Sequence, residues 1–358
     1  MTLTNYASGI ISGDGGAISG SMSPTLTITN FGTISGGIDA VSGAISGNVV
    51  NVTNSGTISV ASGSGGSAIS MTSGSVTNNA GGSITGDFDT IASEGNTTIF
   101  NAGTISAASG DAILFAFFGG NTLTIAPTSV INGNVVATGT DTFQLGGTGS
   151  GTFDLSTIGP AQQYEGFDTF NVIGATWTAI NTFAQNSPWT VQGGTFLVNG
   201  DLSSASSLTV TGGTLGGIGT VGDTQIDGGG TLAPGSGSPS GTLTVSGNLA
   251  FNTGSFYAIQ IAPGAGNNSK TVVNGTATLG GNGTVVVTPQ VGNYNSTVYQ
   301  ILTTPAPVDL IGTFAGLTVN GNVNGTATLN YVMDPGDVDL VISGSILFTP
   351  PSGANQNQ

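Results

Sequence analysis

The sequence has no cysteine, no histidine and no arginine, and its only basic residue is Lys270. A fold stapled by disulfides is therefore excluded. Serine and threonine are abundant, but without histidine almost nothing could activate them as nucleophiles. Binding to nucleic acid or to an anionic membrane needs a basic surface, which a single lysine does not supply. We therefore expect a protein that is not an enzyme, has no catalytic residues and binds no nucleic acid.

Charged residues and long apolar runs are also scarce. Only 5% of the chain is charged, and 17 acidic residues against one basic residue give a formal net charge of −16. The longest apolar run, residues 112–118, is far too short to span a membrane. Isoleucine, valine and leucine nevertheless recur at regular intervals, which disordered chains lack. The acidic balance should keep copies of the chain apart in solution.

A repeat of about two dozen residues is the dominant feature of the first third of the chain. Each copy has an asparagine followed closely by Thr-Ile-Ser or a near copy of it. The asparagines are separated by 25, 24, 24 and 23 residues (30−5, 54−30, 78−54 and 101−78). A fixed period of this size predicts a solenoid. The repeated asparagines are Asn5, Asn30, Asn54, Asn78 and Asn101.

Each period contains three short β-type runs, separated by glycine and asparagine, in which one aliphatic residue alternates with serine or threonine. This alternation predicts strands. Three such strands per period predict one turn of a right-handed parallel β-helix, all-β in class, with its aliphatic residues stacked inside. We expect the asparagines to form a ladder of side-chain amides at a turn, in a left-handed backbone conformation. One of the three runs is predicted at residues 17–19, 40–42, 68–70, 90–92 and 112–114.

The pattern divides the chain into four parts. Residues 1–135 are regular coils, residues 136–250 continue the β-helix, residues 251–345 form a C-terminal β-hairpin or cap region, and residues 346–358 are a tail. The whole chain would hold about 15–16 turns at the β-sheet spacing. In the cap region, four Asn-Gly pairs are predicted tight turns. They begin at Asn274, Asn282, Asn320 and Asn324.

Phenylalanines interrupt the small-residue pattern near the end of the regular coils. Phe115, Phe117 and Phe118 fit either a wider core or an exposed aromatic patch for a partner.

Several acidic residues were candidates for chemistry, and for each the structural interpretation is favoured. Asp87 and Asp89 share one predicted strand face, where two carboxylates could serve a glycosidase, but we expect solvated charges at the coil edges. Asp141 and Asp154 lie in a stretch with a faint likeness to a calcium-binding Gly-Asp repeat, and we expect turn residues. We therefore predict no metal site and no cofactor.

A further acidic cluster precedes the last predicted strand. Asp334, Asp337 and Asp339 fall in residues 333–340, which we expect to form a turn, with a surface site for a divalent ion as the alternative.

The middle and C-terminal parts resemble a known family. Residues 164–179 (YEGFDTFNVIGATWTA), 193–202, 212–222 (GGTLGGIGTVG), 228–235 (GGGTLAPG) and 241–250 follow one another as in the passenger domains of autotransporters, the type V secretion proteins. The resemblance covers about residues 160–345. It implies a β-helix whose C-terminal part acts as an autochaperone, capping the helix and nucleating folding. It also implies a partner outside this chain, an outer-membrane β-barrel translocator.

The resemblance further implies a location and a role. A passenger rod is secreted or displayed on the cell surface of a Gram-negative bacterium, where it would contact other cells, glycans or like rods as an adhesin. Residues 1–10 have no basic start and no apolar stretch of a signal peptide, so we expect a mature segment. Two alternatives remain open: a subunit of an extracellular fibre that stacks end to end, and a β-helix enzyme acting on polysaccharide.

Overall fold

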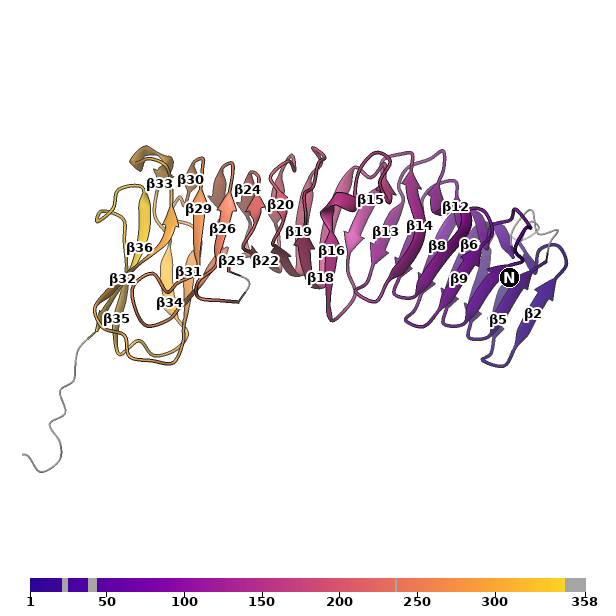
Figure 1. The fold of residues 1–358 in the computed structure, drawn as a ribbon, viewed down its shortest axis with the longest axis horizontal. Coiled ribbons are helices and arrows are strands. Elements are labelled where there is room, and N and C mark those ends of the chain that lie inside the picture. Colours follow the sequence, from indigo (N-terminus) through magenta and orange to yellow (C-terminus); the bar gives the residue numbers. More distant parts are fainter. Residues whose placement is uncertain (21–24, 38–43, 236, 345–358) are drawn as a thin grey trace, which may run out of the picture.

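The protein is an elongated parallel β-solenoid (Figure 1). The computed structural model describes residues 1–20, 25–37, 44–235 and 237–344. The N-terminus lies at one end of the rod and the last strands lie at the other (Figure 1). The predicted all-β parallel β-helix is confirmed, but it has about 12 turns, fewer than expected. The long corners and the C-terminal hairpin add residues without adding turns.

Three ladders of parallel strands form the sides of the rod. The first ladder contains β1 (Thr2–Asn5), β4 (Thr25–Asn30), β6 (Ile45–Asn54), β8 (Ile69–Asn78), β11 (Thr97–Asn101), β13 (Thr122–Ile125), β15 (Thr142–Leu145), β18 (Thr169–Ile180), β19 (Trp189–Val198), β21 (Leu208–Val210), β24 (Thr224–Ile226), β27 (Leu249–Phe251), β30 (Ala277–Thr278) and β33 (Leu310–Ile311).

The second ladder shares the bent strands β18 and β19 and contains β2 (Ile10–Gly13), β5 (Thr33–Gly36), β7 (Thr57–Val60), β9 (Ser83–Gly86), β12 (Thr104–Phe115), β14 (Val130–Ala137), β16 (Ser150–Asp154), β22 (Thr214–Gly217), β25 (Thr231–Pro234), β28 (Phe256–Ile261), β31 (Thr284–Pro289) and β34 (Gly316–Val319).

The third ladder shares β6, β8, β12 and β14 and adds β3 (Ile18–Ser19), β10 (Ile91–Ser93) and β17 (Tyr164–Glu165). A separate sheet follows with β20 (Asp201–Leu202), β23 (Thr220–Val221), β26 (Thr242–Val245), β29 (Lys270–Val273), β32 (Thr297–Thr303), β36 (Asp337–Gly344) and β35 (Gly325–Asn330). Two short 3-10 helices, η1 (Leu155–Thr157) and η2 (Pro307–Asp309), lie between strands.

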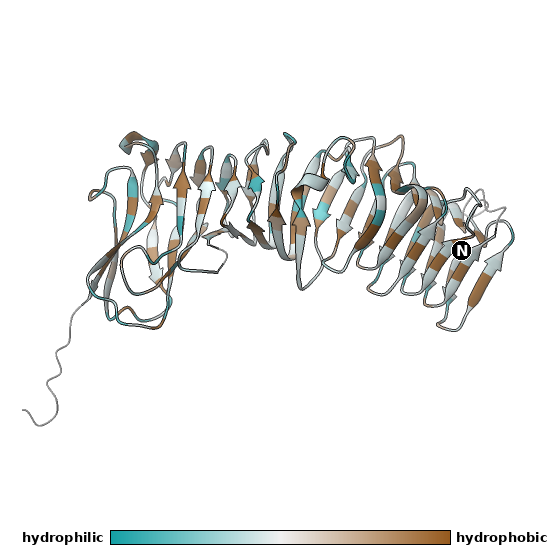
Figure 2. Ribbon diagram, in the orientation of Figure 1, coloured by the Kyte–Doolittle hydropathy of each residue, from teal (hydrophilic) through white to brown (hydrophobic). Residues whose placement is uncertain are grey.

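Aliphatic side chains stack in columns inside the rod because successive strands of the N-terminal coils pair without a shift. In the second ladder Ile34, Ile58, Ile84 and Ile105 face one another in register, and each is fully buried. Figure 2 shows the resulting hydrophobic bands on neighbouring strands. One coil alone could not bury these side chains, so the core exists only because the coils stack.

The repeated asparagines form the predicted ladder. Each side-chain amide donates from Nδ2 to Oδ1 of the asparagine on the next coil, over 2.8 to 2.9 Å. The last one, Asn101, donates instead to Ser129 Oγ at 2.6 Å. The five residues in order are Asn5, Asn30, Asn54, Asn78 and Asn101, and all are buried.

The expected left-handed conformation of these asparagines is wrong. None of them is among the non-glycine residues with positive φ. Each is instead the last residue of an extended strand, so its amide points inward at the corner. An extended backbone at the corner lets the asparagine side chain point inward. Positive φ angles fall mainly on glycines, such as Gly74 with φ +134°.

The second coil uses a different register from the one predicted. Residues 40–42 were expected to stack on residues 17–19, but they lie outside the described residues. Ile18 pairs with Ile45 instead, and Ile45 pairs in turn with Ile69. Residues 44–46 carry the same Ala-Ile-Ser pattern and lead directly into the rest of β6, which explains why stacking selects them.

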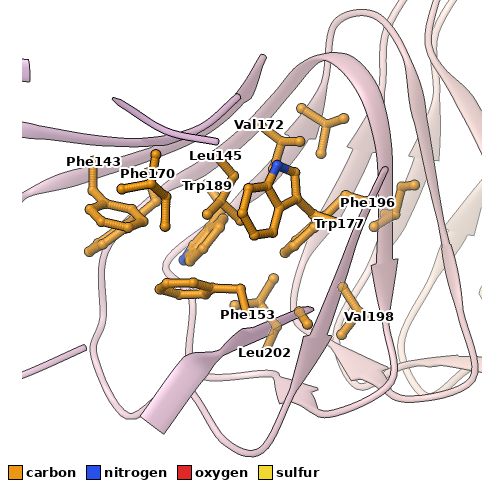
Figure 3. Close-up of a cluster of buried hydrophobic side chains, with 14 of the residues drawn as sticks. Phe143, Leu145, Phe153, Phe170, Val172, Trp177, Trp189, Phe196, Val198 and Leu202 are labelled. Atoms are coloured by element: carbon orange, nitrogen blue, oxygen red, sulfur yellow. The ribbon is translucent and has the colours of Figure 1, made fainter. Parts of the chain in front are cut away.

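The middle of the rod has an aromatic core (Figure 3). The inward column of the first ladder changes there from Leu123 to Phe143, Phe170 and Trp189. The rings of Phe170 and Trp189 stack at 4.9 Å, and Trp189 stacks on Phe196 at 5.3 Å. Such offset contacts stabilise beyond the area that they bury.

The C-terminal end is closed by an antiparallel sheet, as predicted. Strand β36 lies between β32 and β35 and is antiparallel to both. Residues 331–336 connect β35 to β36, and the connection ends in a turn where Asp337 N donates to Asp334 O at 3.0 Å. Parallel stacking continues as far as β33 and β34, so the four predicted Asn-Gly turns do not make the hairpin. Asn274, for example, joins β29 to β30, which belong to different ladders.

Candidate functional site

The two acidic residues considered for glycoside chemistry serve the corners of the coils. Asp87 and Asp89 lie after β9, not on a shared strand face as predicted. Asp87 accepts hydrogen bonds from Gly63 N at 2.9 Å and Gly65 N at 2.6 Å, which hold the pKa of its carboxyl below the ordinary value. Asp89, which was expected to be solvated, is buried instead. Its Oδ1 accepts a hydrogen bond from Asp111 N at 2.9 Å.

Asp141 and Asp154, which were expected in turns, lie at the ends of strands: Asp141 directly precedes β15, and Asp154 is the last residue of β16. Asp141 is buried, and Oδ1 accepts from Asn121 N and from Asn121 Nδ2, both at 2.9 Å. Asn121 Oδ1 accepts in turn from Thr97 N at 2.9 Å, so this corner has a polar column of its own. Asp154 caps η1 by accepting from Ser156 N at 2.9 Å. Both carboxylates are thus occupied by N–H donors.

The last acidic cluster divides between the turn and the strand. Asp334 and Asp337 form the predicted turn. Asp339 lies within β36 with only 1% of its surface exposed, and its Oδ2 has no hydrogen-bond partner. Burial, together with the charges of Asp334 and Asp337, raises the pKa of Asp339 to about 6. Among the described residues, no three acidic side chains are grouped so that they could hold a metal ion.

The phenylalanines at the end of β12 divide between the core and the surface. Phe115 is fully buried and packs edge-on against Phe167, with ring centroids 6.3 Å apart. Phe117 and Phe118 are exposed by 79% and 63%. The exposed pair sits at the corner that leads from the third ladder to β13.

A shallow groove on the outside of the third ladder ends at Phe117. It encloses about 460 Å³ and crosses β6, β8, β10 and β12. One row of its wall is in strict register from coil to coil, because Ser46 pairs with Ser70, Ser70 with Ala92, and Ala92 with Leu114. The row beside it carries Asn48, Thr72, Glu94 and Ala116.

Phe117 has a strained backbone. Its φ is +65°, in the left-handed region that bulky residues avoid. Phe118 N donates to Ala116 O at 2.8 Å across it, so Phe117 is the centre of the rare positive-φ type of γ-turn. The same N–H donates to Glu94 O at 2.7 Å on the preceding coil. Such strain costs on the order of 1–3 kcal/mol, and it clusters at functional sites.

Close packing around the turn holds Phe117 in this conformation. A side chain at Gly95 would place its Cβ 2.5 Å from Phe118 Cβ, and one at Gly139 would come within 2.4 Å of Gly119. The coils on both sides therefore fix the turn, and the phenyl ring points into solvent beside the groove. The groove was not predicted from the sequence. The one feature of the sequence that could have indicated the groove is the pair Phe117 and Phe118, which ends a pattern of small residues.

The groove mixes polar and apolar surface and is nearly uncharged. Its lining offers hydroxyl and amide groups that both donate and accept hydrogen bonds, one exposed carboxylate at Glu94, and the apolar surfaces of Leu114, Ala116 and Phe117. Lys270 lies in β29, far along the chain. This lining can bind by hydrogen bonds and apolar contact, and it has no cation to attract an anion.

No helix in the part of the chain that the structure describes is long and apolar enough to cross a membrane. Comparison with protein-family models and with curated proteins gives no match.

Proposed function

We propose that this chain is the non-enzymatic passenger rod of an autotransporter, secreted or displayed at the surface of a Gram-negative cell, where it has an adhesive role. The observation that carries the proposal is the position of the family-like motifs on the rod. Residues 212–222 hold β22 and β23, and residues 228–235 hold β25, so the motifs occupy successive coils. The antiparallel sheet of β32, β36 and β35 closes the same end of the solenoid.

Charge and shape support an adhesive role over a catalytic one. The rod has a net charge of −16, which favours solubility and separation from like rods. The carboxylates considered for glycoside chemistry accept backbone N–H groups at corners. Its outer faces carry rows of serine, threonine and asparagine, such as Thr29, Thr53 and Thr77 in successive coils. Rows of this kind suit a surface that binds rather than reacts.

The proposal is tested on intact bacteria that carry the gene. Antibodies raised against the purified chain should detect a protein that external protease degrades while a cytosolic control protein survives. Deletion of the gene should reduce adhesion of the cells to one another or to host surfaces. A chain that protease reaches only after lysis would refute the proposal.

Electron microscopy and an enzyme assay separate the two alternatives. Single rods of the purified chain fit the proposal, whereas continuous filaments would indicate a fibre subunit. Release of reducing sugar from plant or bacterial polysaccharides would indicate an enzyme.

A further inference from the structure

We infer that the groove ending at Phe117 binds a neutral linear oligosaccharide, with the Phe117 ring against the face of one sugar. The inference names a class of ligand for the adhesive role proposed above. It rests on that proposed function only in taking the glycan to come from a cell surface. Four observations carry it: a strained turn, the row of the wall in register, the lining chemistry and the charge.

The turn at Phe117 presents an aromatic ring that the fold itself does not use. The ring is 79% exposed, so it adds little to the core. Its φ of +65° would suit glycine, and glycine is already common at such positions in this chain. A bulky aromatic residue is thus held in an unfavourable backbone conformation with most of its surface in solvent. Strain of this kind points to a function.

The wall of the groove matches an extended ligand. Ser46, Ser70, Ala92 and Leu114 lie one per coil. At the inter-strand distance of about 4.8 Å, three steps span roughly 14 Å along the rod. The wall changes along this line from hydroxyl groups to aliphatic groups, and Phe117 lies beside its last step, on the same coil as Leu114. A short linear chain can therefore lie along the rod axis and reach both kinds of contact.

The lining complements a sugar more closely than a peptide. Sugar hydroxyl groups both donate and accept hydrogen bonds, as the hydroxyls of Ser46, Ser70 and Thr72 and the amide of Asn48 do. Glu94 adds an acceptor for two neighbouring sugar hydroxyls. The C–H face of a sugar ring is apolar and packs on the flat face of an aromatic ring, which Phe117 supplies.

Charge narrows the ligand to a neutral one. The groove holds one carboxylate, and the whole chain carries −16 with a single lysine. An anionic glycan or a second copy of the chain would therefore be repelled. A basic peptide would be attracted by the same overall charge, so it is included as a comparison in the test.

The test measures binding of defined oligosaccharides to the purified chain. Isothermal titration and saturation-transfer NMR are carried out with cellotetraose, chitotetraose and maltotetraose, with tetragalacturonate and a lysine-rich peptide as charged comparisons. We expect at least one neutral tetrasaccharide to bind with a Kd of roughly 1 mM or tighter. Tetragalacturonate should not bind.

Three variants assign the binding to the groove. Phe117→Gly should weaken binding at least tenfold and keep or raise Tm, since glycine accepts a φ of +65°. Phe117→Trp should keep binding within about threefold. Phe31→Ala is the control, because Phe31 is a phenylalanine of the N-terminal coils that is 48% exposed and lies outside the groove. It should bind as the unaltered chain does.

The inference is overturned if no neutral tetrasaccharide binds at roughly 10 mM, if only the lysine-rich peptide binds, or if Phe117→Gly and Phe31→Ala behave alike. Its failure is distinct from that of the proposed function. A chain exposed to protease on intact cells that binds no sugar refutes only the glycan site. A chain that binds sugar but stays inside the cell refutes only the surface role.

Discussion

From Asn30 to Asn101, each ladder asparagine both donates and accepts through its side-chain amide in a buried site. Asn54 Nδ2 donates to Asn78 Oδ1 at 2.9 Å and to Gly56 O at 3.1 Å, while its Oδ1 accepts from Asn30 Nδ2 at 2.8 Å. A buried polar group is costly only when it is unpaired, so the ladder stabilises through its completeness. Loss of Asn54 takes the donor from Asn78 Oδ1, while Asn30 Nδ2 keeps only its bonds to the carbonyl oxygens of Gly32 and Thr57.

We therefore predict that Asn54→Ala lowers the free energy of unfolding by about 2–4 kcal/mol. Asn54→Asp should cost more, since a carboxylate cannot donate to Gly56 O or to Asn78 Oδ1 and would be a buried charge. Urea denaturation measures both. Asn79→Ala is the control, because Asn79 is partly exposed and bonds only Ser55 Oγ, and it should change stability by about 0.5 kcal/mol or less. An Asn54→Asp chain as stable as the control would contradict the ladder's role.

The two tryptophans are predicted to respond differently to the same substitution. Trp177 Nε1 donates to Gly146 O at 3.1 Å, whereas buried Trp189 Nε1 has no hydrogen-bond partner. Trp177→Phe leaves that carbonyl without its donor, but Trp189→Phe removes an unsatisfied N–H while it keeps ring stacking with Phe170. We expect Trp177→Phe to lower stability by about 1 kcal/mol more than Trp189→Phe. Thermal melting of the two variants tests this, and the opposite order would count against it.

At the scale of the element, the C-terminal hairpin contains a carboxyl group, that of Asp339, whose ionised form is destabilised by burial. Asp339 in β36 is buried, and its pKa is raised to about 6. In the unfolded chain its pKa is near 3.9. The folded state therefore binds the proton more tightly, so its contribution to stability is full below about pH 4 and is lost as the pH rises through about 6.

Asp339→Asn should consequently stabilise the hairpin at pH 8 by roughly 1–2 kcal/mol and have little effect at pH 4. Thermal melting at the two pH values gives the comparison. Asp334→Asn removes only one of the neighbouring charges that raise the pKa of Asp339, so its gain at pH 8 should be smaller. Equal effects of Asp339→Asn at both pH values would mean that the carboxylate is not destabilising when ionised.

Much of the architecture at this scale could be predicted because the repeat itself encodes it. The spacing of the asparagines gave their ladder, and period-two alternation gave short strands such as β21, β25 and β26. The register of the second coil could not be predicted, since residues 40–42 and 44–46 carry equivalent patterns and only stacking on Ile18 and Ile69 distinguishes them. The same holds for the column through Asn121 and Asp141, whose spacing of 20 residues departs from the repeat.

The groove could not be predicted from the sequence. Its wall depends on which outward residues fall in register on four coils, and its end depends on one positive φ at Phe117. Neither follows from local propensity, which would place glycine at that φ. The sequence indicated an exposed aromatic pair as one of two alternatives, and the coil corners decided that Phe115 points inward and Phe117 outward.

At the scale of the whole molecule, stability should vary along the rod, since each coil contacts only its neighbours. In the described chain, β1, β2 and β3 pair with a strand on one side only, and Ile10 is 75% exposed. In the middle, β18 pairs along both of its halves and its aromatic residues are buried. Regions with few buried contacts open with a lower free energy than well-packed ones.

Hydrogen exchange followed by mass spectrometry should therefore find the fastest backbone exchange in β1–β3 and the slowest in residues 142–198. Phe170→Ala should accelerate exchange first in the strands that stack on Phe170, which are β15 and β19, because their side chains lose its ring. The N-terminal β4 and β5 should stay unchanged, since several coils separate them from the substitution. Uniform protection along the rod, or an acceleration that reaches β4 as strongly as β15, would instead show that the solenoid unfolds as one cooperative unit.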